Sequence, residues 1–199
     1  SSTLQAICQH APAIILAALF GGPAIAGLYA LSQRIMGLPV KLLSEAASKV
    51  FLGEARGLDN VSLRQHFLRT MLLFTGVGLL GLLPVILFGP ALFAWLFGAN
   101  WYDAGVIAQL LAPLYLSRFI VQPLSHTLYI INRQDIVFIS SIMNFCALFG
   151  AFYLGKLLLL SGYTTILLFS IFSAMSFLFN LAMAWYFVRH GGAAAPDRG

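Results

Sequence analysis

The chain has 199 residues, of which 60% are hydrophobic, 14% aromatic and 9% charged, with a formal net charge of +5 and a mean hydropathy of +0.92. A soluble domain of this length needs far more charged side chains to cover its surface, so the composition excludes that class. The basic residues lie at the ends of apolar segments and inside them, not in one exposed patch, and we expect no nucleic-acid partner. The sequence predicts an all-α, polytopic membrane protein in contact with membrane lipids.

Six apolar segments are long enough to cross a bilayer as helices, because a hydrocarbon core of about 30 Å needs about 20 helical residues. In chain order they are Leu4 to Phe20, Ile25 to Leu52, Leu63 to Phe88, Ala104 to Ile131, Ile136 to Leu160, and Thr164 to Val188. Pro90 opens a shorter apolar piece, 91–97, which we expect to form interfacial helix. Residues 1–190 are thus predicted to form one six-helix transmembrane lobe, followed by a disordered cytoplasmic tail over 191–199.

The distribution of Lys and Arg predicts the orientation. The basic residues near the ends of the segments are Lys49, Arg56, Arg64, Arg69, Arg133, Arg189 and Arg198. They all fall on one side of the six-helix arrangement, and short cytoplasmic loops are enriched in such residues, so we expect both termini to be cytoplasmic in the cell inner membrane. Lys156 is the exception, and its side chain can reach the headgroups of the other side. The chain starts without an initiator Met, and we expect it to be a fragment of a larger transporter.

The second segment carries a narrow polar stripe. At about 100° per residue, Arg34, Lys41 and Glu45 fall on one side of the helix. Arg34 lies about 14 Å from the start of the segment, near mid-depth, whereas Lys41 can pair with Glu45 one turn further on, the interpretation that we favour for this lysine. Gly37 and Pro39 interrupt the helix between the two cations, and we interpret them as a hinge.

The fourth segment repeats this pattern with Arg118 near mid-depth and Gln122 one turn later on the same face. Pro113 and Pro123 bracket the arginine, and we expect them to act as further hinge positions, since prolines at membrane depth are typical of cavity-lining helices. A charge inside the membrane is costly unless it faces a protein interior or a wet cavity. We therefore predict that Arg118 and Gln122, together with Arg34 and Lys41, bind an anionic substrate such as a phosphate or pyrophosphate. A structural ion pair or snorkelling of the arginines stays an alternative.

The remaining polar residues do not form a catalytic or metal-binding pattern. Ser125 and His126 are neighbours on a helix, so their side chains point about 100° apart, and no acid completes a triad. The other histidines are unclustered and the two cysteines, Cys8 and Cys146, are isolated. We expect no catalytic residue, no metal and no cofactor, and hence no enzyme. We expect Asn144 and Asn180 to form hydrogen bonds between helices. Two stripes of small residues spaced by four predict close packing of helices, one at Ala147, Ala151 and Gly155 and one at Ser176, Asn180 and Ala184.

Several short motifs together resemble those of prokaryotic polysaccharide flippases, which transport O-antigen and other lipid-linked oligosaccharides and belong to the multidrug/oligosaccharidyl-lipid/polysaccharide exporter superfamily. The motifs are LFGGPAIAGLYALSQR at 19–34, LP at 38–39, AASKVF at 46–51, LFG at 96–98 with Trp101, PLS at 123–125 and NRQ at 132–134. Their order and spacing cover nearly the whole chain, from about residue 4 to 189.

This resemblance implies that the chain is the C-terminal lobe of a two-lobe transporter whose N-terminal lobe is missing here. Such transporters move an undecaprenyl-diphosphate-linked oligosaccharide to the outer leaflet by alternating access, for lipopolysaccharide and other surface polysaccharides. The resemblance places Arg34 against the diphosphate, whereas Arg118 is assigned on depth and charge alone. Two alternatives are a cation-coupled multidrug exporter of the same superfamily, which needs a carboxylate in the membrane, and a membrane-embedded enzyme of polysaccharide assembly, which needs a nucleophile with its base or a carboxylate dyad.

Overall fold

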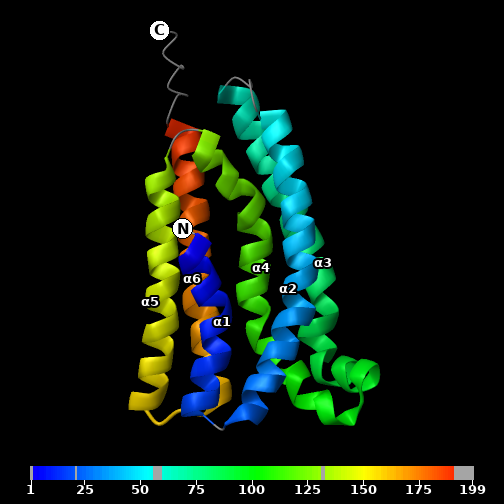
Figure 1. Ribbon diagram of the computed structural model, residues 1–199. Helices are drawn as coiled ribbons and strands as arrows, with labels where there is room; N and C mark the ends of the chain where they lie inside the picture. The colour runs from blue at the N-terminus through cyan, green and yellow to red at the C-terminus, as the bar shows by residue number, and fades with distance from the viewer. Residues whose placement is uncertain (1, 21, 56–59, 131–132, 191–199) are drawn as a thin grey trace.

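The computed structural model describes residues 2–20, 22–55, 60–130 and 133–190, and these ranges are helical almost throughout (Figure 1). The helices are α1 (Ser2–Leu19), α2 (Pro23–Ala55), α3 (Asn60–Phe97), the short 3-10 helix η1 (Ala99–Trp101), α4 (Tyr102–Ile130), α5 (Gln134–Leu157) and α6 (Gly162–His190). Each predicted segment coincides with one long helix to within a few residues at its start. The all-α class is therefore confirmed for the described residues, while the predicted tail over 191–199 lies outside them.

The third helix differs from the prediction because the piece 91–97 is joined to it. α3 continues through Phe97 with one break, at Phe88, where φ is −127° and ψ is 16°. Pro90 lacks an N–H and leaves the carbonyl of Ile86 without its helical donor. The side chain of Gln109 in α4 takes that place, since its Nε2 donates to Ile86 O at 2.8 Å. A bond from a neighbouring helix thus stabilises the kink.

Four helices of the described chain are long and apolar enough to cross a membrane, namely α3, α4, α5 and α6. They support the prediction of a membrane protein. α2 is not among them, because its charged stripe lowers the hydropathy of a helix that is otherwise long enough. The crossing of the bilayer by α1 and α2 stays a prediction.

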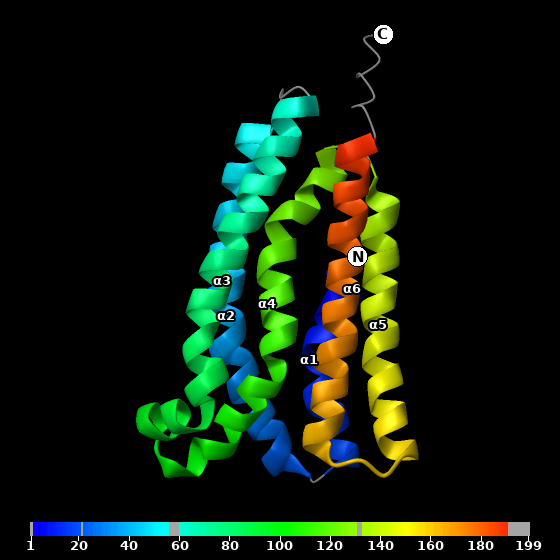
Figure 2. The ribbon, with the colours of Figure 1, turned by 180° about the vertical axis from the view of Figure 1, so that it is seen from behind.

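α4 is the central helix of the bundle. It packs against α2 and α3 on one side and against α6 on the other, and α5 packs on α6 while α1 contacts α2 and α5. Figures 1 and 2 show this division from opposite sides, with α2 and α3 together and α1, α5 and α6 together. Buried side chains of α4, among them Ile107, Ala108, Leu111 and Tyr115, form the middle of the main hydrophobic cluster.

Candidate functional site

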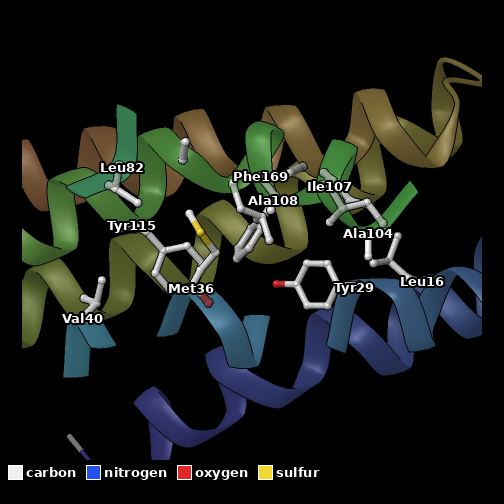
Figure 3. Packing of buried hydrophobic residues seen from close by; sticks show 14 of the residues in the cluster. Leu16, Tyr29, Met36, Val40, Leu82, Ala104, Ile107, Ala108, Tyr115 and Phe169 are labelled. Atoms are coloured by element: carbon white, nitrogen blue, oxygen red, sulfur yellow. The ribbon is translucent and has the colours of Figure 1, made fainter. Parts of the chain in front are cut away.

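Arg118 lies half-buried on α4, beside two tyrosines at the contact between α2 and α4. Tyr115 lies one turn earlier on α4, and both Tyr115 and Tyr29 of α2 are near enough for the charge of Arg118 to act on their phenol groups. Both tyrosines are core residues, 4% and 2% exposed. Figure 3 shows their hydroxyl groups pointing into the space between the two helices, next to Met36. Tyr115 Oη donates to the carbonyl of Gln33 at 3.3 Å, which fixes the phenol ring.

No ion pair within the described ranges joins Arg118 to a carboxylate. The positive charge is therefore balanced here only by polar, neutral groups. A guanidinium carries five N–H donors in a planar fork that fits the oxygens of carboxylate or phosphate groups. At a half-buried position such a group is well suited to hold an anion, because attraction between charges is stronger where water is scarce.

Gln122 follows Arg118 by one helical turn and is also half-buried. Its Oε1 atom is buried and has no hydrogen-bond partner among the described residues. Leaving a buried polar atom unpaired costs about 1–3 kcal/mol, so the amide of Gln122 has an unmet hydrogen-bonding group at this position. Residues four apart share a helix face, and the joint role of Arg118 and Gln122 in binding stays a prediction.

Arg34 is exposed and lies apart from Arg118. The side of α2 that packs on α4 carries the buried residues Tyr29, Ser32, Met36 and Val40. At about 100° per residue, Arg34 falls on the opposite side of the helix. It makes no hydrogen bond or ion pair with any described residue. The structure therefore does not bring the two arginines together within this lobe.

Lys41 and Glu45 form an exposed pair on α2. Lys41 Nζ lies 3.9 Å from Glu45 Oε1, and the two side chains are 59% and 50% exposed. The pairing predicted from their four-residue spacing is confirmed. A role of Lys41 in binding substrate stays a prediction, and an exposed pair of this kind contributes little to stability.

The proposed hinge of α2 is not visible as a break in the backbone. α2 runs as one helix through Gly37 and Pro39, and the only non-helical dihedral angles inside a described helix are those of Phe88 in α3. Gly37 packs against Tyr115, because a Cβ at this glycine would lie 3.4 Å from Tyr115 Oη. The small residue thus lets the phenol approach α2, and bending at this point stays a prediction.

The two prolines of α4 each lie near a polar side chain of α6. One residue after Pro113, the N–H of Leu114 donates to Ser170 Oγ at 3.2 Å. Two residues after Pro123, Ser125 Oγ lies 3.0 Å from Oδ1 of Asn180, to which it donates, and 2.9 Å from the carbonyl of Val121.

The ribbon of α4 bends toward α6 in its C-terminal third, the part that contains Pro123 (Figures 1 and 2). Asn180 bonds between helices as expected. Asn144 of α5, for which the same was expected, makes no hydrogen bond with described residues. The part played by Ser170 was not foreseen.

A catalytic or metal site does not emerge from the described residues. No group of three or more His, Cys, Asp or Glu side chains lies close enough there to hold a metal ion. The hydroxyl of Ser125 is engaged with α6 and α4 as described above. The side chains of His126 and Cys8 lie outside the described ones, and Cys146 is a free, exposed thiol.

Sequence reasoning missed the two tyrosines beside Arg118. Tyr115 could have been found, because it precedes Arg118 by three residues and so shares its helix face. Tyr29 lies far away in the sequence, and only the packing of α2 on α4 brings it to the same place. Comparison with known proteins gives no further guide, since no family model, no curated protein and no solved structure matches the chain.

Proposed function

We propose that this chain is one lobe of a transporter that flips an undecaprenyl-diphosphate-linked oligosaccharide across the cytoplasmic membrane. The observation that carries the proposal is Arg118, a half-buried guanidinium in the middle of an apolar helix with no carboxylate partner among the described residues. A charge at such a place is costly and marks a functional site by default. Its sign favours an anionic ligand, and a diphosphate offers the oxygens that a guanidinium binds in pairs.

The exposure of Arg34 supports the proposal that another part of the protein lies beside α2. A guanidinium at mid-depth is not stable against lipid tails, so its surroundings are either water or protein. In the proposed transporter another lobe of the same polypeptide faces this side of α2 and encloses a wet cavity between the lobes. Arg34 then reaches the substrate from the cavity wall, and both termini of the present lobe are cytoplasmic.

Within this lobe, the diphosphate binds Arg118 in the proposed mechanism. The amide of Gln122 supplies a donor once it is turned toward a phosphate oxygen, while the buried Tyr29 and Tyr115 form the protein side of the site. Alternating access then changes the exposure of this group from one side of the membrane to the other, with bending at the prolines of α2 and α4. The charge of the substrate stays compensated during the crossing.

A drug exporter that takes cations needs a carboxylate available in the membrane. Among the described carboxylates, that of Glu45 lies deepest within a predicted membrane segment. It is exposed and paired with Lys41. The charge on this lobe therefore favours an anionic lipid substrate over a cationic drug.

The test is transport by the complete protein in proteoliposomes that contain a fluorescent polyprenyl-diphosphate oligosaccharide. We expect Arg118→Ala to reduce translocation at least tenfold and Arg118→Lys to restore part of it, because lysine keeps the charge but loses the planar fork. Arg64→Ala is the matched control, since Arg64 is exposed and its guanidinium stacks over Trp185 at 5.3 Å, away from this site. Undiminished translocation by Arg118→Ala would remove the group from the mechanism.

A further inference from the structure

A groove of about 430 Å³ opens between the C-terminal half of α2 and the N-terminal half of α3. α2 contributes Ala47 and Val50, and α3 contributes a single helix face that includes Arg69, Leu73 and Phe74. The groove exists because both helices pack on α4, whereas their described residues make little direct contact with each other. Figure 1 shows the two helices that form it, α2 and α3, next to each other. Neither Tyr29 nor Tyr115 is among the residues that line the groove.

The walls of the groove are mostly apolar, and their polar groups are the guanidinium of Arg69, the hydroxyl of Thr70 and the imidazole of His66. Arg69 is exposed and makes no hydrogen bond or ion pair with the residues that the structure describes. Thr70 follows it and is half-buried in the same groove. Lys49, next to Val50 on α2, is exposed and adds a second positive charge at this end of the helices. A ligand that fits must combine a negative group with an apolar body.

The depth of Arg69 in the membrane follows from the sequence of α3. No charged residue occurs between Thr70 and the break at Phe88. This stretch measures about 28 Å at 1.5 Å per residue, close to the thickness of the hydrocarbon core. Arg69 then lies at the level of the lipid phosphates, while Leu73 and Phe74 lie just inside the hydrocarbon.

We propose that this groove binds one anionic phospholipid of the surrounding bilayer. Its phosphate accepts hydrogen bonds from Arg69 and Thr70, and the first part of an acyl chain lies along Leu73 and Phe74 against Ala47 of α2. An anionic headgroup is favoured over a zwitterionic one, because Arg69 lines the groove and the exposed Lys49, next to the lining residue Val50, adds positive potential nearby. The bound lipid fills the space that α2 and α3 leave between them. This site is independent of the transport proposed above.

The test uses the complete purified protein, stripped of lipid and titrated with phosphatidylglycerol or phosphatidylcholine, with bound lipid counted by native mass spectrometry. We expect phosphatidylglycerol to bind about fivefold more tightly than phosphatidylcholine, and Arg69→Gln to remove that preference. Arg64→Gln makes the same change of charge on α3 outside the groove and should leave the preference intact. If both variants lost the preference for phosphatidylglycerol equally, the preference would come from general surface charge, and the proposed site would be wrong.

A second variant distinguishes the contribution of the groove itself from that of the charge on Arg69. Ala47→Trp fills the groove while Arg69 stays in place, and it should weaken the binding of both lipids; unchanged binding would contradict the site. Undecaprenyl diphosphate is added as a competitor, and complete displacement of phosphatidylglycerol at equimolar amounts would assign the groove to a transport substrate instead. Circular dichroism of each variant checks that its helix content equals that of the unmodified protein.

Discussion

The two sides of α4 differ in how their polar groups are used. Toward α5 and α6 several buried polar side chains bond to one another or to backbone, as Ser125 does with Asn180 and as Ser176 does with the carbonyl of Ser140 at 2.9 Å, although Ser173 Oγ of α6 has no such bond with a described residue. On the side of α2 and α3, Arg34 and Arg69 are exposed and have no bonding partner among the described residues. The side of α5 and α6 thus has buried hydrogen bonds between its helices, whereas the side of α2 and α3 carries at its surface cations for which no described residue supplies a partner.

The packing differs in the same way. α5 and α6 pack on each other and α6 also packs on α4, whereas α2 and α3 are held chiefly by their separate contacts with α4. Helices with few direct contacts between them rearrange relative to each other at a lower cost. We infer that α2 and α3 can shift relative to each other more easily than α5 and α6 can, while both stay packed on α4.

The largest effect is expected on the stability of the protein, when the close contact between α3 and α4 is disrupted. A Cβ at Gly105 of α4 would collide with the backbone of Gly89 and Pro90 in α3, which no rotation of a side chain relieves. We expect Gly105→Ala to lower the free energy of unfolding by about 3 kcal/mol, the upper end of the range for overpacking. Unfolding by SDS titration in micelles measures this value.

Gly76→Ala in α3 is the matched control, since nothing lies within 4 Å of a Cβ at that position. It should be neutral or slightly stabilising, because alanine favours helix more than glycine does. Equal stability of the two variants would mean that α3 is not anchored at Gly105, and the inference that it stays packed on α4 would lose its basis.

The next effect concerns the exposed arginine of α2. We expect Arg34→Ala to reduce translocation of the diphosphate-linked lipid about tenfold, with the protein still inserted in the membrane, and Arg34→Lys to recover part of the activity. Labelled substrate in proteoliposomes reports the rate. A normal rate in Arg34→Ala would show that this guanidinium only reaches toward water or headgroups, and α2 would then be an outer helix of the transporter and not a wall of its cavity.

A smaller effect is expected at the bond between α4 and α6. Asn180→Leu keeps the volume of this buried side chain and removes the acceptor for Ser125. A double-mutant cycle with Ser125→Ala should give a coupling of about 1 kcal/mol, within the range for hydrogen bonds between membrane helices. Asn144→Leu serves as control, because Asn144 on α5 is half-buried and makes no hydrogen bond with described residues. A coupling near zero would mean that apolar packing alone holds α6.

The helices could be predicted from the sequence because apolar segments end at clear local signals, such as Gly98 before α4 and Gly162 at the start of α6. The continuation of α3 past Pro90 could not be predicted. It depends on Gln109 of α4, whose side chain donates to the carbonyl of Ile86 in place of the N–H that Pro90 lacks. Helix periodicity puts Arg118 and Gln122 on one face of α4, whose helical structure is confirmed. It could not show that Tyr29 joins them, because that contact depends on how α2 crosses α4.

The same limit applies to the polar stripe of α2. Periodicity placed Arg34, Lys41 and Glu45 on one side of the helix, but the direction of that side depends on which residues pack on α4. The buried series Tyr29, Met36 and Val40 settles it in the structure. Whether this helix crosses the bilayer is a separate question, since the charges that indicate function also lower its hydropathy.

The smallest expected effect is at the ion pair of α2, and it tests what covers this side of the helix. Lys41 and Glu45 are about half exposed in the lobe, so a double-mutant cycle with Lys41→Ala and Glu45→Ala should give a coupling below about 0.5 kcal/mol that falls further in 1 M salt. Unfolding of the complete protein measures it. A salt-insensitive coupling several times larger would mean that water is excluded from the pair, which requires that another protein surface covers this side of α2. Arg34 would then face a closed interface and not the wet cavity proposed for transport.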